Sequence, residues 1–233
     1  MKRAVLFIAA LLALPVPALA QAYQCAAPLV LPPLPRVAAD GPRNAAPVRS
    51  LTLALSWSPE FCRKDHDPKS VQCSGTYGRF GFIVHGLWPE GDGRNAPQWC
   101  APAASPSPET VRRNLCMSPA PYLIAHEWAK HGTCMAANPD DYFRTAHLLW
   151  DRIKWPDIDV LSRRKALTVG DLRQELLIAN PSLRRDSIGV VTNDRGWLHE
   201  LRLCYSRALR SQPCDKHLYG PADSAPLKIW RGI

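Results

Sequence analysis

Two short segments of the sequence hold most of the side chains that could carry out acid–base chemistry. The first, FIVHGLWPE at positions 82–90, contains His85. The second, HEWAKHGTC at positions 126–134, contains four ionisable side chains, namely His126, Glu127, Lys130 and His131. Histidine has an unperturbed pKa of about 6.5, so either protonation state exists near neutral pH. A pair of histidines can therefore supply a general base and a general acid to one reaction.

The ionisable residues of the second segment fall on one side of a helix. At about 100° per residue, Lys130 lies at about 40°, Glu127 at about 100° and His131 at about 140° from His126. Burying such groups unpaired is costly, so this side is either a solvated polar face or a functional surface. Flanking apolar side chains and the cysteine at the end of the segment favour a cleft.

A metalloprotease motif is the nearest alternative for the second segment. That motif needs histidines at i and i+4 with a glutamate beside the first, whereas His126 and His131 stand at i and i+5. Side chains that diverge by about 140° on a helix cannot easily hold one ion. The sequence also lacks a C-x-x-C pair for a zinc knuckle. We therefore expect neither a metal nor a cofactor.

The first 20 residues have the layout of a cleavable secretory signal. Lys2 and Arg3 precede an apolar run, and the segment ends in the small residues Ala18-Leu19-Ala20. Pro15 and Pro17 interrupt the run, which argues against a membrane anchor, because a continuous span needs roughly 20 apolar residues. We expect a periplasmic or secreted protein, in which eight cysteines predict disulfides.

The 233-residue chain carries a formal net charge of +9. A basic exported protein is attracted to polyanions such as nucleic acid, anionic lipid or acidic polysaccharide, and charge alone does not choose among them. After the signal, frequent prolines in residues 21–50 predict an extended arm pinned by Cys25. Residues 51–233 suit one domain with a sizeable core.

Strands and helices do not alternate simply along the chain, which predicts an α+β domain. The predicted strands are 51–57, 80–84, 187–192 and 197–205, the last two joined by a turn. His85 is expected where the second strand gives way to a loop. The predicted helices are 122–131, one capped by Asn138, and 168–179 with an approximate capping box of Thr168 and Asp171.

Together, HGLWP at 85–89 and HEWxKHGTC at 126–134 resemble the active-site segments of the ribonuclease T(2) family, which includes plant S-like and self-incompatibility ribonucleases and bacterial periplasmic ribonucleases. Their order and separation make the pair specific. The likeness extends over about residues 50–215 and includes LSWSPEFC at 55–62 and LHELRLC at 198–204. It implies a central antiparallel sheet packed with helices, and cleavage of single-stranded RNA through a 2′,3′-cyclic phosphate to 3′-phosphate ends.

The resemblance also implies a role for each residue of the constellation. His131 matches the general base and His85 the general acid of the first step, with their roles reversed when the cyclic phosphate is hydrolysed. His126 matches the histidine that contacts the phosphate, while Glu127 and Lys130 match the pair that supports the transition state. From the residues alone, Glu127 could either orient His126 and Lys130 or contact the phosphate when protonated.

Two further residues of the first segment are candidates for base binding. Trp88 could stack on any base, because each base has a π-face, although a core position is the competing interpretation. Glu90 could accept a hydrogen bond from a base edge. We expect Trp99 in the core or at its rim. Structural or surface positions are expected for the remaining histidines, His66, His147, His199 and His217.

The resemblance suggests the disulfides Cys62–Cys73, Cys100–Cys134 and Cys204–Cys214, which leaves Cys25 to pair with Cys116. We expect a monomer that acts on RNA. The main alternative from another class is a noncatalytic exported RNA-binding or storage protein on the same fold. That alternative predicts the loss of a histidine from one segment, whereas both segments retain theirs.

Overall fold

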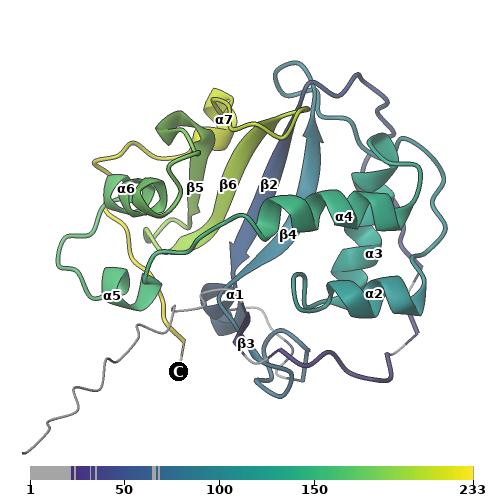
Figure 1. The fold of residues 1–233 in the computed structure, drawn as a ribbon, viewed down its shortest axis with the longest axis horizontal. Coiled ribbons are helices and arrows are strands. Elements are labelled where there is room, and N and C mark those ends of the chain that lie inside the picture. Colours follow the sequence, from purple (N-terminus) through teal and green to yellow (C-terminus); the bar gives the residue numbers. More distant parts are fainter. Residues whose placement is uncertain are drawn as a thin grey trace, which may run out of the picture.

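A four-stranded antiparallel sheet with the strand order β4-β2-β6-β5 forms the centre of the fold (Figure 1). The computed structural model describes residues 22–23, 25–31, 33–34, 36–64, 67 and 69–232, so the expected signal segment 1–20 and His66 lie outside the described residues. The strands of the large sheet are β2 (Ser50–Trp57), β4 (Phe82–Glu90), β5 (Ile188–Thr192) and β6 (Leu198–Ser206). A smaller sheet pairs β1 (Ala22–Tyr23) with β3 (Arg79–Phe80).

The two faces of the large sheet differ in character because side chains alternate along each strand. On one face, Leu53 of β2 pairs with Leu87 of β4 and Leu203 of β6, and all three side chains are buried. On the other face, Thr52 pairs with Trp88. The first face thus carries the core leucines together with aromatic side chains such as Trp57 and Tyr205, and the second face carries polar side chains and Trp88.

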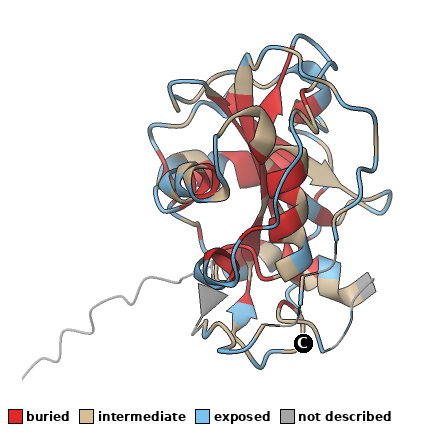
Figure 2. Ribbon diagram, turned by 90° about the vertical axis from the view of Figure 1, so that its right-hand side faces the viewer, coloured by how far each residue is buried: buried red, intermediate tan, exposed pale blue. Residues whose placement is uncertain are grey.

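Helices cover the apolar face and flank both edges of the sheet (Figure 1). They are α1 (Ser58–Lys64), α2 (Pro108–Asn114), α3 (Pro121–Lys130), α4 (Pro139–Trp150), α5 (Ile158–Ser162), α6 (Val169–Ala179) and α7 (Lys216–Tyr219). Side chains of α4 and α6 join the leucines of the sheet in one buried cluster, and Figure 2 shows this buried interior. Among the described residues, no helix has both the length and the apolar character needed to cross a bilayer.

Two helix starts follow the predicted capping chemistry. The Asn138 side chain accepts a hydrogen bond from the backbone N–H of Asp141 at the start of α4. Thr168 and Asp171 form a reciprocal capping box at the start of α6. The predicted α+β class with a central antiparallel sheet is confirmed.

The short helices α1, α2, α5 and α7 were not predicted. The signal for α2 was present, because Ser107 caps the helix by accepting from Thr110 N–H and Pro108 stands at the first helical position. These helices have four to seven residues, and their apolar positions are too few to show a helical period.

The prediction that the second strand ends at His85 is wrong. Strand β4 continues through His85 to Glu90. The pairing register shifts there: Leu55 pairs with Val84 and Ala54 with Gly86, which leaves His85 as the extra residue of a β-bulge. A bulge re-aims a side chain that a regular strand would direct elsewhere. His85 is therefore held by sheet backbone rather than by a loop.

All four predicted disulfides are present: Cys25–Cys116, Cys62–Cys73, Cys100–Cys134 and Cys204–Cys214. The first ties the extended N-terminal arm to the segment between α2 and α3. The third ties the residue after Trp99 to the turn that follows α3. The expectation that Cys25 pins the arm is confirmed.

Candidate active site

Helix α3 presents its ionisable side chains in two rows, each made of residues four apart. His126 and Lys130 face the N-terminal arm, where both contact Asp40. Glu127 and His131 face strand β4 and its histidine. The helix ends at Lys130, and His131 is its C-cap, with φ −109° and ψ −43°. The four groups lie close together as predicted, but the two rows have different partners.

The carboxylate of Glu127 lies between two imidazoles. Its Oε1 is 3.8 Å from Nε2 of His85, and its Oε2 is 3.9 Å from Nε2 of His131. Trp88 Nε1 donates a hydrogen bond of 2.8 Å to the same Oε2. The Glu127 side chain is 4% exposed, and this burial raises the pKa of the carboxyl to about 7, against the lowering effects of His85 and Trp88. Both predicted catalytic histidines therefore lie within 4 Å of the same carboxylate.

Glu200 and Arg202 on β6 form a chain of hydrogen bonds that ends at His85. Nδ1 of His85 is 2.8 Å from Oε2 of Glu200, and Arg202 Nε donates to Oε1 of that carboxylate at 2.9 Å. Burial lowers the pKa of His85, but the hydrogen bond to Glu200 and the negative charges of Glu127 and Glu200 outweigh it, so the pKa is raised above its ordinary value. His85 is thus biased towards the charged form with Nε2 directed at Glu127.

His131 has the opposite electrostatic environment. Burial is the main cause that lowers its pKa to about 3, and the positive charges of Lys130, His126 and His85 lower it further. At neutral pH His131 is an uncharged imidazole, able to accept a proton. The two histidines that flank Glu127 therefore have pKa values displaced in opposite directions.

The arm supplies an acidic residue to the other row of α3. Oδ2 of Asp40 is 2.9 Å from Nζ of Lys130 and 3.6 Å from Nε2 of His126. The hydrogen bond from Lys130 lowers the pKa of Asp40. Burial lowers the pKa of His126, although Asp40 acts against this. Lys130 and His126 form an anion-binding pair that already holds a carboxylate.

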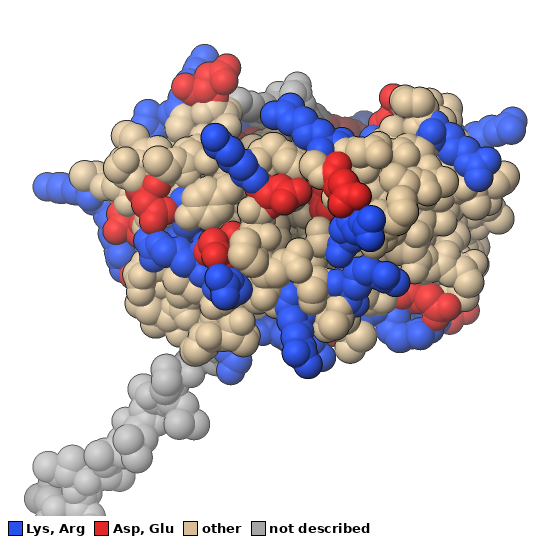
Figure 3. All heavy atoms as spheres, turned by 90° about the horizontal axis from the view of Figure 1, so that it is seen from above, with Lys and Arg blue, Asp and Glu red and all other residues tan. Residues whose placement is uncertain are grey.

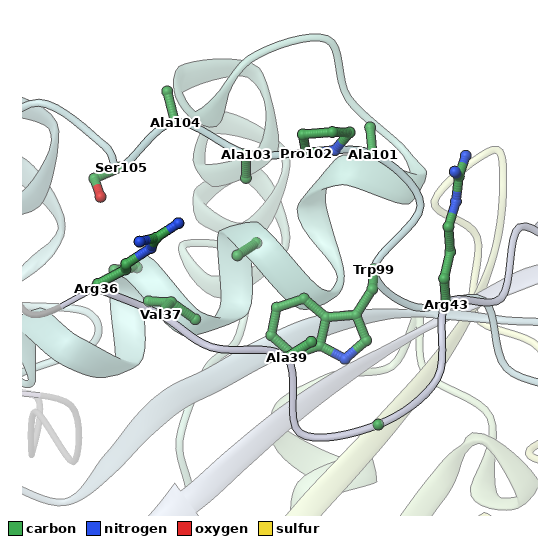
Figure 4. A pocket seen from close by; sticks show the side chains of 13 residues that line it. Arg36, Val37, Ala39, Arg43, Trp99, Ala101, Pro102, Ala103, Ala104 and Ser105 are labelled. Carbon is green, nitrogen blue, oxygen red and sulfur yellow. The ribbon is translucent and has the colours of Figure 1, made fainter.

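Trp99 packs beside this anion-binding pair, where sequence placed it in the core or at its rim. Its ring meets that of His126 edge to face, with centroids 5.5 Å apart, and its backbone N–H donates to the Lys130 carbonyl at 2.7 Å. Its φ of 53° is uncommon for a bulky residue. Figure 4 shows the arm passing this indole, with Ala39 against the ring. Trp99 is half-buried and lies next to the site.

Two glycines make the close packing around the site possible. A Cβ added to Gly86 would lie 1.9 Å from Glu127 Oε2 and 2.5 Å from Trp88 Nε1, so a side chain there would displace this hydrogen bond. A Cβ added to Gly132 would lie 2.3 Å from the Trp128 ring. Gly86 therefore lets α3 approach β4 closely, and Gly132 lets the turn after α3 pack against Trp128 and Tyr142.

The two candidate base-binding residues lie on the polar face of β4. The ring of Trp88 has His85 and His131 as neighbours, with centroids 5.2 and 5.8 Å away, and Arg202 lies over it. Glu90 is 5% exposed, and burial raises its pKa. Trp88 thus has a structural contact to Glu127 that sequence did not predict. Base binding by either residue stays a prediction.

Sequence reasoning missed Glu200, Arg202 and Asp40. Glu200 and Arg202 gave a weak signal, because these two charged residues alternate with leucines along the predicted strand. Asp40 gave none, since the arm has no pattern that places it at the site. The remaining described histidines lie elsewhere: His147 contacts Asn114, and His199 and His217 are exposed. Over the described ranges, no cluster of three or more potential metal ligands occurs.

Comparison with known proteins agrees with the resemblance. A model of the Ribonuclease T2 family matches residues 48–165, which contain both motif segments. A protein named Probable ribonuclease from Haemophilus influenzae is 32% identical over 187 residues, 75% of this chain and 64% of that protein. Ribonuclease I from Escherichia coli is 30% identical over 141 residues, 44% of this chain and 53% of that protein. The chain therefore spans less than two thirds of either relative.

Solved structures share the fold. The RNase-related protein from Calystegia sepium has a TM-score of 0.60 at 23% identity, covering 78% of this chain and 97% of that one. The self-incompatibility associated SF11-RNase from Nicotiana alata has a TM-score of 0.57 at 18% identity, covering 79% of this chain and all of that one. At such identities the likeness concerns architecture.

Proposed function

This chain belongs to the Ribonuclease T2 family, and we propose that it is an endoribonuclease that cleaves single-stranded RNA without a metal ion, using the substrate's own 2′-hydroxyl as nucleophile. The observation that carries this proposal is the convergence of His85 and His131 on Glu127, with pKa values displaced in opposite directions. One histidine is suited to give a proton and the other to take one.

In the first step, neutral His131 accepts the proton of the 2′-hydroxyl. The 2′-oxygen attacks the adjacent phosphorus, and the bond from phosphorus to the 5′-oxygen of the next nucleotide breaks. Protonated His85 donates to that departing oxygen. The products are a 2′,3′-cyclic phosphate and a free 5′-hydroxyl, with His131 charged and His85 neutral.

In the second step the two roles reverse. His85 accepts a proton from water, the hydroxide oxygen attacks the cyclic phosphate, and His131 returns its proton to the 2′-oxygen. The product is a 3′-phosphate, and both histidines regain their starting states. A base with a pKa as low as about 3 is weak. A bound phosphate anion adds negative charge beside His131 and so raises its pKa towards the range in which proton transfer is efficient.

The anion-binding side of α3 is suited to the developing negative charge. Lys130 supplies a fixed positive charge, and His126 joins it when protonated. Glu127, with a pKa of about 7, exists in both protonation states near neutral pH. When protonated it could donate to a phosphate oxygen, and when ionised it stabilises the charged form of each histidine in turn. Because both imidazoles lie within 4 Å of this carboxylate, we assign it to both tasks.

RNA is the polyanion that this chemistry requires, and the charge of the protein suits it. The net charge of the full chain is +9, of which Lys2 and Arg3 belong to the expected signal, and Figure 3 shows Lys and Arg side chains scattered across one face with Asp and Glu among them. Phosphate attraction of this kind is independent of sequence. We assign the choice of base, where the enzyme makes one, to Trp88 and Glu90.

Export to an oxidising compartment, such as the periplasm or the medium, is part of the proposal. All eight cysteines are paired in disulfides, which persist where thiols are oxidised. We propose a monomer, since the site is assembled from one chain. The noncatalytic alternative is less favoured because both histidines lie at the site with distinct charge states.

A short oligoribonucleotide with one 2′-O-methyl group tests the proposed reaction. Cleavage should stop only at the linkage on the 3′ side of the modified sugar, and neighbouring linkages should still be cut, with or without a chelator. Mass spectrometry should detect cyclic phosphate ends first and 3′-phosphate ends later. Fragments with 5′-phosphates, or activity that a chelator abolishes and zinc restores, would show that the nucleophile is water or a metal-bound hydroxide.

A further inference from the structure

The anion-binding pair of the site already contacts an anion from the same chain. The Asp40 carboxylate approaches both Lys130 Nζ, at 2.9 Å, and His126 Nε2, at 3.6 Å. Lys130 supplies a positive charge, and His126 adds a second one when it is protonated. A phosphate bound by the same two groups would have to occupy the space of the Asp40 carboxylate, because two anions cannot share it without strong repulsion.

The arm holds Asp40 in place by contacts that do not involve its side chain. Cys25–Cys116 fixes the arm on one side. On the other side, Asn44 exchanges two backbone hydrogen bonds of 2.9 Å with Gln98, and Gln98 Nε2 donates to the Pro42 carbonyl. Because the fold tethers Asp40 beside Lys130 and His126, its carboxylate has a high effective concentration at these two groups.

The carboxylate is nevertheless able to leave. The Asp40 side chain is 50% exposed, so a change of rotamer can move it into water. A cavity of about 440 Å³ lies between the arm, the loop 101–105 and α3, and Ala39 and Gly41 line it on either side of Asp40 (Figure 4). The arm thus has space to move between the Cys25–Cys116 disulfide and the hydrogen bonds at Asn44.

We infer that Asp40 is an intramolecular competitor of the substrate phosphate, held by the N-terminal arm at the anion-binding pair of Lys130 and His126. Asp40 belongs to the arm and lies outside the stretch 48–165 that the family model matches. The substrate must displace the carboxylate, and this competition weakens phosphate binding. Only RNA that binds tightly enough to displace Asp40 is then bound productively. The inference rests on the proposed function only in taking the displaced ligand to be a phosphate of RNA.

Binding of inorganic phosphate tests the inference without any cleavage. We would measure its dissociation constant by calorimetry for the wild type and for Asp40→Asn, Asp40→Glu and Asp92→Asn. Asp92 is a matched control because it is an exposed aspartate paired with Arg49, so its replacement makes the same change in net charge. Asp40→Asn should bind phosphate about three- to tenfold more tightly. Asp40→Glu and Asp92→Asn should remain within about twofold of wild type.

A double-mutant cycle locates the effect. In a Lys130→Met background, Asp40→Asn should change phosphate affinity by less than about twofold, because the permanently charged member of the shared pair is gone and only His126 remains. Unfolding temperatures identify any variant that fails to fold. Phosphate binding that is unchanged or weaker in Asp40→Asn would overturn the inference and make Asp40 a positioning residue for Lys130. An equal gain in Asp92→Asn would overturn it too, as an effect of net charge.

The RNA assay separates this inference from the proposed function. If the wild type cleaves RNA, Asp40→Asn should lower KM more than it raises kcat, because it removes a competitor of the ground-state complex. If the wild type does not cleave RNA, the proposed function fails, and the phosphate measurements still decide whether Asp40 competes for the anion site.

Discussion

The imidazole of His85 is held by Glu200, with Nδ1 and Oε2 2.8 Å apart, although the two residues are 115 positions apart in the chain. Strand β2 lies between β4 and β6 and pairs with both, which brings the two residues to the same region of the sheet. The bulge in β4 directs the imidazole of His85 towards Glu200. The contact fixes Nδ1 as the donor when the ring is charged, so Nε2 carries the proton that faces the reaction. Glu200 thus controls both the direction and the charge of the proposed acid.

Glu200→Gln should shift the alkaline limb of the pH–rate profile to lower pH. The Glu200 charge stabilises the imidazolium of His85, so its loss lowers the pKa of His85, and the acid deprotonates at lower pH. Turnover at neutral pH should fall, by less than the about 10²–10⁴-fold expected for removal of the acid itself. The measurements are kcat against pH and an NMR titration of His85. Glu109→Gln on α2, exposed and paired with Arg113, is the control.

An unshifted alkaline limb in Glu200→Gln, with His85 titrating as in the wild type, would contradict this role. Glu200 would then be a buried structural acid that satisfies Arg202.

His85→Ala and His131→Ala should each reduce kcat by at least about 100-fold, because general acid and general base each contribute about 10²–10⁴. The double variant should lose much less than the product of the two single losses, since the two groups act in one concerted proton relay. His217→Ala, at an exposed site on α7, should have no effect. Near wild-type turnover in both single variants would remove the paired-histidine mechanism.

Gly86→Ala should inactivate the enzyme while leaving it folded. The added methyl group would meet Glu127 Oε2 at 1.9 Å and Trp88 Nε1 at 2.5 Å, so α3 and β4 must separate or the Trp88–Glu127 hydrogen bond must break. Overpacking of this kind costs about 1–3 kcal/mol of stability. Trp88→Phe is the matched variant, because it removes the hydrogen bond without the clash.

Comparison of the two variants identifies the cause. Both should raise the pKa of Glu127, because the Trp88 hydrogen bond lowers it. Gly86→Ala should also lose kcat beyond Trp88→Phe. If Gly86→Ala retains full activity, the close approach of α3 to β4 is not needed for catalysis.

The sequence identified the ionisable residues of the two motif segments as candidates, because the segments are short and the helical spacing of the second is visible in the sequence. Periodicity predicted three of the four strands of the large sheet and the three long helices, but it ended the second strand too early, at His85. Caps at Asn138 and Thr168 set two of the helix starts. The sequence did not predict the bulge at His85. A bulge depends on the pairing partner, and nothing within residues 82–90 specifies which residue of β2 lies opposite.

The partners of the motif residues could not be predicted because they come from distant segments. Glu200 reaches His85 through the sheet, and Asp40 reaches Lys130 across 90 positions through an arm fixed by a disulfide. The displaced pKa values of His85 and His131 follow from these partners and from burial, so the distinct charge states of the two histidines are a property of the fold. Sequence alone assigned their roles by resemblance.

Replacement of the buried Glu127 should make the stability of the protein less dependent on pH and should lower its activity. The pKa of Glu127 is about 7 in the folded protein against an ordinary value of 4.5. Between these values the folded state binds more protons than the unfolded state, so Glu127 makes stability fall as pH rises from 4.5 to 7. Glutamine does not titrate. The free energy of unfolding of Glu127→Gln, relative to that of the wild type, should therefore be about 1–3 kcal/mol higher at pH 7 than at pH 4.5.

Urea unfolding of both proteins at pH 4.5 and pH 7 measures this difference directly. His131, with its lowered pKa, makes stability fall with acidification over part of the same range, and burial, the main cause of that shift, is common to both proteins. The part of the His85 pKa shift that Glu127 causes is lost in the variant and belongs to the measured difference. Glu109→Gln supplies the baseline for an exposed glutamate. Glu127→Gln should also lose turnover, because no carboxyl remains between the two imidazoles. If the variant is destabilised more at pH 7 than at pH 4.5, the folded protein needs the ionised carboxylate as the partner of charged His85, and the neutral form of Glu127 has no place in the mechanism.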